Sequence, residues 1–317
     1  MTRLVLEKNQ LFIYLAAVSS GLILGILNPQ LGSRLEIMVW PLLGFLLYST
    51  FTQVPLTHLR EAFYKPKLVL AAIAGNFVLI PLAVACLLLL APNDPAVRLG
   101  ILLVLLVPCT DWFITFTQLG GGDTKQAIAF APISLLLQIL LLPLYLWMFL
   151  GNEFQLSLAH GGMIWAFVGL IIVPLVLAFL TQKCSANQPK GEQLINILAW
   201  FPVLLLAIVM FIIASSQVTI VLDSGTLLFH LLLIFVLFLL VAAVIAKFLS
   251  KLIQLSSQQG RVLAFSFGTR NSFVMLPIAL ALPAAYELAV VVIVFQSLVE
   301  LIGMMVFLWW VPKQLFR

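Results

Sequence analysis

Two short clusters of polar residues interrupt strongly apolar segments of this chain, and their side chains are of the types that bind solutes or carry protons. The first cluster consists of Pro108, Cys109, Thr110 and Asp111. The second consists of Gly268, Thr269, Arg270, Asn271 and Ser272, with Pro277 five residues further on. An ionisable side chain in hydrocarbon costs at least about 2.5 kcal/mol, so it usually faces a cavity or a partner and marks a path for ions or solutes. These clusters are therefore the predicted functional site.

The charged residues predicted to lie within the membrane are Asp111, Glu300 and Arg270. One arginine neutralises one carboxylate, and an unpaired buried carboxylate tends to hold a proton. Asp111 and Glu300 are thus candidates for proton or ion coupling. The alternative is that Arg270 bridges both acids in a fixed network that only stabilises the fold.

Neutral polar side chains supply further candidate ligands. The thiol of Cys109 suits soft, thiophilic ions. Hydroxyl and amide groups, which suit a polar solute or a cation, belong to Thr110, Asn271 and Ser272. The same groups can instead form hydrogen bonds with backbone that a helix break sets free. Asn76, in an earlier apolar segment, is a further candidate for ion coupling.

The composition places these clusters in a membrane protein. Of the 317 residues, 63% are hydrophobic and 9% are charged, whereas soluble domains have roughly 45–50% apolar and about 25% charged residues. The net charge of +5 is spread over segment ends and forms no basic run, which argues against nucleic-acid binding. The three cysteines are too few and too scattered for a disulfide framework or a structural zinc site, so no metal and no cofactor are predicted.

Apolar windows between polar breaks predict about ten transmembrane helices. They cover residues 11–28, 37–56, 68–91, 97–119, 125–150, 162–181, 193–216, 227–248, 260–282 and 287–311. With a cytoplasmic N-terminus, thirteen Lys and Arg residues fall in cytoplasmic loops, and two, Arg34 and Arg98, fall on the other side. A wrong number of spans would scramble this bias. It therefore predicts a multi-pass protein of the cytoplasmic membrane with both termini in the cytoplasm.

Ten helices divide into two halves of five, at about residues 1–155 and 156–317, within one transporter domain. An odd number of spans in each half gives the halves opposite orientations, as in the inverted repeats of many secondary transporters. The fourth helix then corresponds to the ninth, and these two carry the polar clusters. Pro108 should break the fourth helix, and Gly268 and Pro277 should break the ninth. The predicted fold is an all-α polytopic membrane protein with two broken helices.

Three stretches of the sequence resemble the bile acid/arsenite/riboflavin transporter superfamily. They are residues 76–82, residues 107–110 together with Gly122 and Asp123, and residues 268–272. Cys109 in the fourth helix and Glu300 in the tenth are similar to the signature of arsenite efflux permeases of the arsenical-resistance-3 type. This resemblance implies that the broken helices 4 and 9 cross. It also implies export of arsenite or antimonite in exchange for protons, with Cys109 recognising the metalloid and Glu300 taking part in proton coupling.

The sequence departs from the arsenite permeases in ways that keep an alternative open. The stretch 270–273 is closer to the sodium/bile acid symporters, and Asp111 is an additional acid. The alternative is sodium-driven uptake of a small organic anion whose carboxylate or sulfonate meets Arg270. The predicted sodium ligands are then Asn76, Thr110, Asn271, Ser272 and Glu300. An intramembrane enzyme is disfavoured, because no histidine base lies near Cys109 in the sequence.

Overall fold

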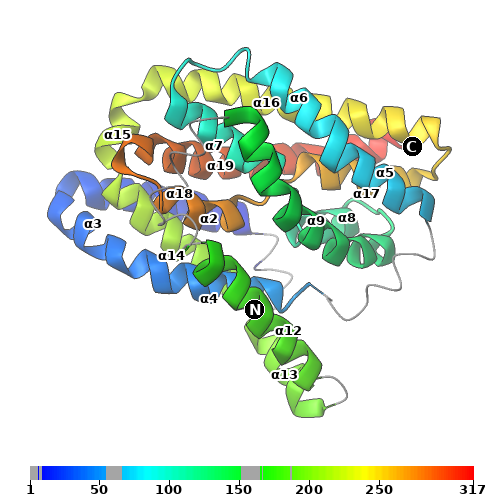
Figure 1. The fold of residues 1–317 in the computed structure, drawn as a ribbon, viewed down its shortest axis with the longest axis horizontal. Helices are drawn as coiled ribbons and strands as arrows, with labels where there is room; N and C mark the ends of the chain where they lie inside the picture. The colour runs from blue at the N-terminus through cyan, green and yellow to red at the C-terminus, as the bar shows by residue number, and fades with distance from the viewer. Residues whose placement is uncertain (1–5, 7–8, 55–65, 151–164, 166, 186–187) are drawn as a thin grey trace.

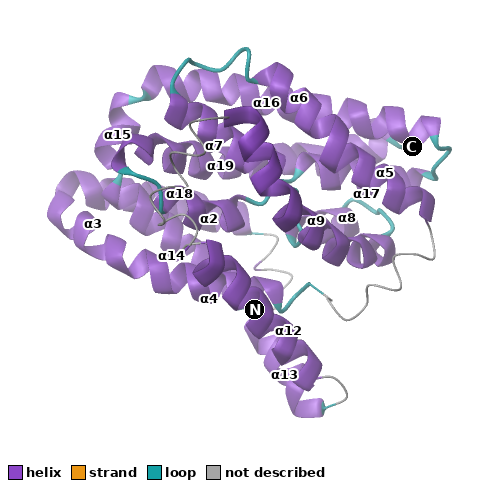
Figure 2. Ribbon diagram, in the orientation of Figure 1, coloured by secondary structure: helices purple, strands orange, loops and turns teal. Residues whose placement is uncertain are grey.

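The computed structural model describes Leu6, Trp165 and residues 9–54, 66–150, 167–185 and 188–317 (Figure 1). These residues form helices joined by short loops, and none of them lies in a β-strand (Figure 2). The start of the sixth predicted helix and the boundary near residue 155 lie outside the described residues, as do Arg3, Lys8, Arg60 and Lys65. The described part of the chain confirms the predicted all-α fold.

Among the described residues, eight helical segments are long and apolar enough to cross a membrane. In the first half of the chain they are α2 (Gln10–Leu27), the run of α3 (Pro29–Leu35), η1 (Glu36–Met38) and α4 (Val39–Phe51), the run of α5 (Pro66–Ala74), η3 (Gly75–Leu79) and α6 (Ile80–Leu87), and α9 (Thr124–Leu150). In the second half they are the run of η4 (Val168–Ile172) and α12 (Val173–Ser185), the run of α13 (Pro189–Leu198) and α14 (Phe201–Ser216), α16 (Gly225–Leu252), and the run of η5 (Ala284–Tyr286), α19 (Glu287–Trp310) and η6 (Val311–Leu315). The short helix α15 (Val218–Asp223) joins α14 to α16.

Two further segments are each divided into two short helices. The first consists of α7 (Pro95–Leu106) and α8 (Trp112–Leu119), and the second of α17 (Ser257–Gly268) and α18 (Ser272–Leu280). With these two segments, the described residues account for the ten predicted spans. Pro108 lies in the first break and Gly268 is the last residue before the second, so the interruptions fall in the fourth and ninth spans, as the sequence predicts.

The prediction that Pro277 also breaks the ninth span is wrong. Pro277 lies inside α18, which continues to Leu280. A proline removes one hydrogen bond of the helix ladder, and neighbouring groups in a membrane bundle make up for such a loss. The break ends instead at Asn271, whose side-chain oxygen accepts a hydrogen bond from the N–H of Val274 at 3.4 Å and caps the start of α18.

The helices form two groups (Figure 1). In the first group, α2, α3 and α4 pack with α12, α13 and α14. In the second, α5 to α9 pack with α16 to α19. The first group contains spans one, two, six and seven, and the second contains spans three, four, five, eight, nine and ten. Each group thus takes corresponding spans from the two predicted halves.

The outward faces of the helices suit a lipid bilayer. Large apolar side chains on them are exposed, such as Leu140 on α9 at 71% and Val244 on α16 at 64%. A soluble protein rarely leaves such side chains in contiguous contact with water. The described helices therefore present the apolar surface that a membrane requires.

Glycines allow α2 to pack closely against α14. Gly21 and Gly25 lie four residues apart, a spacing that brings transmembrane helices together. A Cβ atom on Gly21 would lie 2.3 Å from the backbone oxygen of Phe211, and one on Gly25 would lie 2.5 Å from that of Ser215. Since helix backbone cannot move aside as a flexible side chain can, the two helices reach this distance only with glycine at both positions.

We expect Gly25→Ala to lower the free energy of unfolding by about 1–3 kcal/mol, the usual effect of overpacking. The measurement is thermal unfolding of the protein purified in detergent. Gly169→Ala is the matched control, because no described atom lies within 4 Å of a Cβ atom at that position. Equal unfolding temperatures for the two variants would contradict the close packing of α2 on α14.

Candidate functional site

The two helix breaks lie against each other and exchange backbone hydrogen bonds. The N–H of Cys109 donates to the carbonyl oxygen of Thr269 at 3.2 Å. The N–H of Asn271 donates to the carbonyl oxygen of Val107 at 2.8 Å. The two breaks thereby form an isolated antiparallel bridge. Backbone groups that the breaks set free therefore satisfy each other.

We call residues 107–111 and 269–271 together the crossing. The local sequence explains its extended backbone. Val107 precedes Pro108, whose ring disfavours the helical conformation of the residue before it, and Val107 has φ −106° and ψ 110°. Thr269 is extended as well, with φ −100° and ψ 138°, and a β-branched residue adopts this conformation readily.

Cys109 lies just before α8, with its sulfur at the N-terminal end of that helix. The backbone N–H groups of Asp111 and Phe113 lie near the sulfur. The N-terminal end of a helix carries about half a positive charge, which favours an electron-rich atom. Asp111 is half-buried at the start of the same helix. The thiol singled out in the sequence therefore belongs to the crossing and lies close to the start of α8.

Asn76 reaches the crossing through an irregular helix. It lies in η3, a π-helix, and such widened turns occur often at functional sites. Pro81 has no N–H for the carbonyl oxygen of Phe77, and the hydroxyl of Tyr145 donates to this oxygen instead, at 2.6 Å. Gly75 lets α17 approach closely, because a Cβ atom here would lie 1.9 Å from a phenylalanine ring of that helix. The side-chain amide of Asn76 thus comes to lie against α17.

Both terminal nitrogens of the Arg270 guanidinium group bind oxygen atoms without formal charge. These oxygens are Asn76 Oδ1 at 2.9 Å and the carbonyl oxygens of Leu105 at 3.3 Å, Ser266 at 3.0 Å and Phe267 at 2.8 Å. None of them belongs to a carboxylate. The hydrogen bonds of the guanidinium group therefore go to neutral oxygens, while the charges of Arg270 and Glu300 are close enough to attract each other.

Glu300, on α19, supports the crossing with one oxygen of its carboxylate. Oε2 accepts hydrogen bonds from the backbone N–H of Arg270 at 2.9 Å and from the side-chain amide of Gln296 at 2.7 Å. The oxygen of the Gln296 amide accepts a hydrogen bond from the hydroxyl of Ser272 at 2.9 Å. Oε1 of Glu300 has no hydrogen-bond partner among the described residues. Oε2 thus supports the backbone of the crossing, and Oε1 is available for a further hydrogen bond or a proton.

A single peptide unit connects Glu300 with Cys109. It is the unit between Thr269 and Arg270. Its carbonyl oxygen accepts the hydrogen bond from the N–H of Cys109, and its N–H donates to Glu300 Oε2. A peptide unit is planar and rigid. The carboxylate of Glu300 and the backbone of Cys109 are therefore joined through one rigid group.

The crossing brings together most of the residues that the sequence singles out. Those within it are Pro108, Cys109, Asp111, Arg270 and Asn271. Asn76 and Glu300 bond directly to Arg270, and Ser272, the next residue after Asn271, bonds to Gln296. Thr110 is buried in the crossing too, but its hydroxyl has no hydrogen-bond partner within the described part of the chain. Sequence reasoning missed Gln296, Ser266 and Phe238. The ring centre of Phe238 lies 5.4 Å from the guanidinium carbon of Arg270. Only Gln296 leaves a signal, because it precedes Glu300 by four residues on one helix face.

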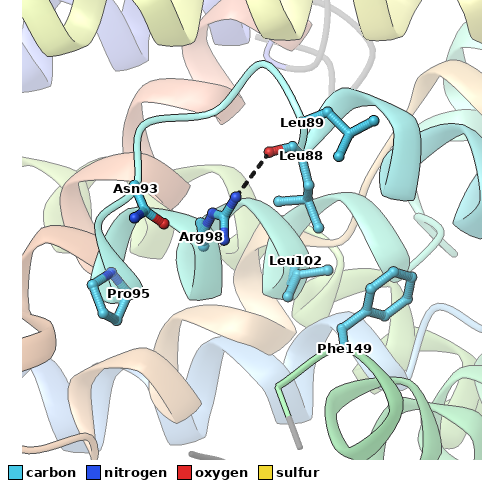
Figure 3. Close-up of a pocket in the computed structure, with 7 residues that line it drawn as sticks. All are labelled: Leu88, Leu89, Asn93, Pro95, Arg98, Leu102 and Phe149. Carbon is cyan, nitrogen blue, oxygen red and sulfur yellow. Dashed lines mark hydrogen bonds between the residues drawn. The ribbon is translucent and has the colours of Figure 1, made fainter.

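Most of the crossing is buried, and Asp111 at its edge is half-buried. Cys109 is 4% exposed, Arg270 is 2% exposed and Glu300 is 1% exposed. A cavity of about 250 Å³ lies elsewhere, at the turn between α6 and α7, where Arg98 donates to the carbonyl oxygen of Leu88 at 3.5 Å (Figure 3). None of the residues that line this cavity belongs to the crossing. This cavity is therefore separate from the candidate site.

Comparison with known families gives one match. The sequence model of the Sodium Bile acid symporter family matches residues 40–248, about two thirds of the chain. The matched stretch runs from α4 to α16 and includes the first break, whereas α17, α18 and α19 lie beyond it. No protein of curated function matches the chain.

Proposed function

Because the chain belongs to the Sodium Bile acid symporter family, whose members are transporters and not enzymes, we propose that it exports arsenite or antimonite across the cytoplasmic membrane in exchange for protons. Broken helices near the middle of a helical membrane domain are the usual place for solute and ion sites in secondary transporters. The observation that carries the proposal is the peptide unit that connects Glu300 with Cys109.

Glu300 is the proton carrier in this proposal. Its carboxyl group is buried, and Oε1 is the position for a proton, since no described residue bonds to it. Protonation removes the negative charge and weakens the hydrogen bonds that Arg270 and Gln296 donate to the carboxylate. Because Cys109 is bonded to the same peptide unit, protonation and solute binding influence each other, as exchange requires.

Cys109 is the residue that recognises the solute. A neutral metalloid hydroxide needs no counter-charge, and a thiol is the soft ligand that such an element prefers. The hydroxyl of Thr110, which has no partner in the described structure, is available for a hydroxyl group of the solute. Asn271 and Ser272, at the second break, add an amide and a hydroxyl, which in this conformation bond to the N–H of Val274 and to Gln296. This combination supports a small, uncharged solute.

The arrangement in the membrane is part of the proposal. The excess of Lys and Arg in alternate loops supports a cytoplasmic position for both termini. The grouping of corresponding spans and the antiparallel contact between the two breaks support an inverted repeat. Such a repeat would make α7–α8 and α17–α18 equivalent halves of one site.

A second candidate function is sodium-coupled symport of a small organic anion, which the description of the matched family suggests. Arg270 would then meet the anionic group of the solute. In the described conformation, however, both terminal nitrogens of Arg270 already bond to protein oxygens, and the side chain is buried. This arrangement makes the second candidate the weaker one.

We expect everted membrane vesicles that contain the protein to accumulate arsenite when a proton gradient is imposed, because export becomes uptake in everted vesicles. A sodium gradient of equal size should have no effect. The measurement is the arsenic content of the vesicles over time, with vesicles that lack the protein and vesicles treated with a proton ionophore as controls.

Two outcomes would count against the proposal. Absence of arsenite accumulation under either gradient would remove arsenite as the solute. Accumulation of a carboxylate or sulfonate under a sodium gradient alone would establish the second candidate in its place.

A further inference from the structure

The guanidinium group of Arg270 occupies a cage of oxygen atoms inside the crossing. Four oxygens lie within 3.3 Å of its two terminal nitrogens, and the side chain is 2% exposed. The ring of Phe238 lies 5.4 Å from the guanidinium carbon, within the range of a cation–π contact. The surroundings therefore combine several groups that attract a positive charge.

The origin of these oxygens explains why a positive charge belongs there. Leu105 O lies in the last turn of α7, and Ser266 O and Phe267 O lie in the last turn of α17. The last four carbonyl groups of a helix have no partner within it. Each C-terminal end carries a charge of about −0.5, so two such ends together present a charge of about −1. One monovalent cation balances this charge.

Membrane transporters with broken helices meet the same requirement with a free ion. Carbonyl oxygens of unwound backbone and C-terminal ends of half-helices are the groups that coordinate Na⁺ in such proteins. Asn76 Oδ1 completes the cage from η3, and its amide nitrogen is fixed by a hydrogen bond to the hydroxyl of Ser266 at 2.9 Å. The cage thus has the ligands of a cation site and already holds a cation that is part of the chain.

We propose that Arg270 is a tethered cation that takes the place of a bound sodium ion at the crossing. The protein then needs no sodium at this position, and removal of the Arg270 side chain opens a site for Na⁺ formed by Asn76 Oδ1 and the three carbonyl oxygens. The inference rests on the proposed function in one respect: without a sodium ion at this position, the proton carried by Glu300 is the coupling ion. It holds for any solute.

The test is thermal unfolding of the detergent-purified full-length chain in NaCl, KCl and choline chloride at equal ionic strength. We expect the unfolding temperature of the wild-type protein to be the same in the three salts. Arg270→Ala should be less stable than wild type in KCl and choline chloride, and NaCl should raise its unfolding temperature by several degrees with a saturable dependence on concentration. The variant should also bind radioactive sodium, whereas the wild-type protein should not.

Arg261→Ala is the matched control. Arg261 also donates to backbone carbonyl oxygens, those of Gly121 at 3.0 Å and Phe316 at 2.9 Å, but it lies at the other end of α17, away from the crossing. Its replacement should lower stability equally in all three salts. Arg270→Lys, which keeps a tethered charge, should remain indifferent to sodium.

Several outcomes would overturn the inference. Sodium-specific stabilisation of the wild-type protein would do so regardless of any variant, and so would an Arg270→Ala protein that responds alike to sodium and potassium. If Arg270→Ala is recovered unfolded in every salt, Arg270→Gln takes its place, and indifference of that variant to sodium decides against the proposal. Because no solute is present in these measurements, failure of arsenite export does not affect their result.

Discussion

Glu300→Gln should reduce proton-driven accumulation of arsenite in vesicles to the level of vesicles without the protein. Glutamine has nearly the shape of glutamate and still offers an oxygen to the N–H of Arg270 and to the amide of Gln296, so the crossing should keep its structure. It has no carboxyl group and therefore cannot carry an exchangeable acidic proton. The variant should therefore lose coupling while it stays folded and abundant in the membrane.

The matched control for this prediction is Glu287→Gln. Glu287 lies in the first turn of the same helix, α19, and is exposed. Its replacement should leave accumulation at the wild-type rate. If Glu300→Gln accumulated arsenite as fast as wild type under the proton gradient, Glu300 would not be the proton carrier.

Cys109→Ser should remove arsenite transport and return cells to the sensitivity of a strain without the protein. Serine is nearly isosteric, and its oxygen can accept hydrogen bonds from the backbone N–H groups of Asp111 and Phe113, which lie near the sulfur of Cys109. The oxygen is a hard ligand with little preference for a thiophilic element. The change therefore separates recognition of the solute from support of the backbone. Growth in arsenite measures the resistance of the cells, and immunodetection of the protein in membranes measures its abundance.

Cys86→Ser and Cys184→Ser are the controls for Cys109→Ser. Both of these cysteines are exposed, whereas Cys109 is buried. Each control should retain full resistance, so that loss in Cys109→Ser alone identifies the thiol at the crossing. Full resistance in Cys109→Ser as well would exclude a thiol from the transport path and would direct attention to the organic anion as solute.

The sequence was sufficient to predict the spans and the positions of the two breaks. Apolar length and the distribution of Lys and Arg are properties of the chain itself, so they do not depend on how the helices are placed. Pro108 acts locally too, because its ring constrains Val107 wherever the segment lies. Pro277 shows the limit of this reasoning, since the bundle accommodates one missing hydrogen bond inside α18.

The partners of Arg270 could not be predicted in the same way. Charge counting suggests a carboxylate, but the guanidinium group lies between the ends of two half-helices, whose carbonyl groups attract it without formal charge. Those ends come together only in the folded protein. Ser266 and Phe238 contribute for the same reason, from positions on α17 and α16 that carry no distinctive sequence pattern.

The hydrogen bonds between the two breaks affect how a protein of this architecture can diverge. Both bonds join main-chain atoms, from Cys109 to Thr269 and from Asn271 to Val107. Replacement of a side chain leaves the main-chain N–H and C=O groups in place, except where proline is introduced. Side chains that contact the transported solute can therefore be replaced one at a time while the main-chain contact between the two breaks persists. Proteins that share this main-chain contact can acquire new solutes by point mutation and keep the arrangement of the two broken helices.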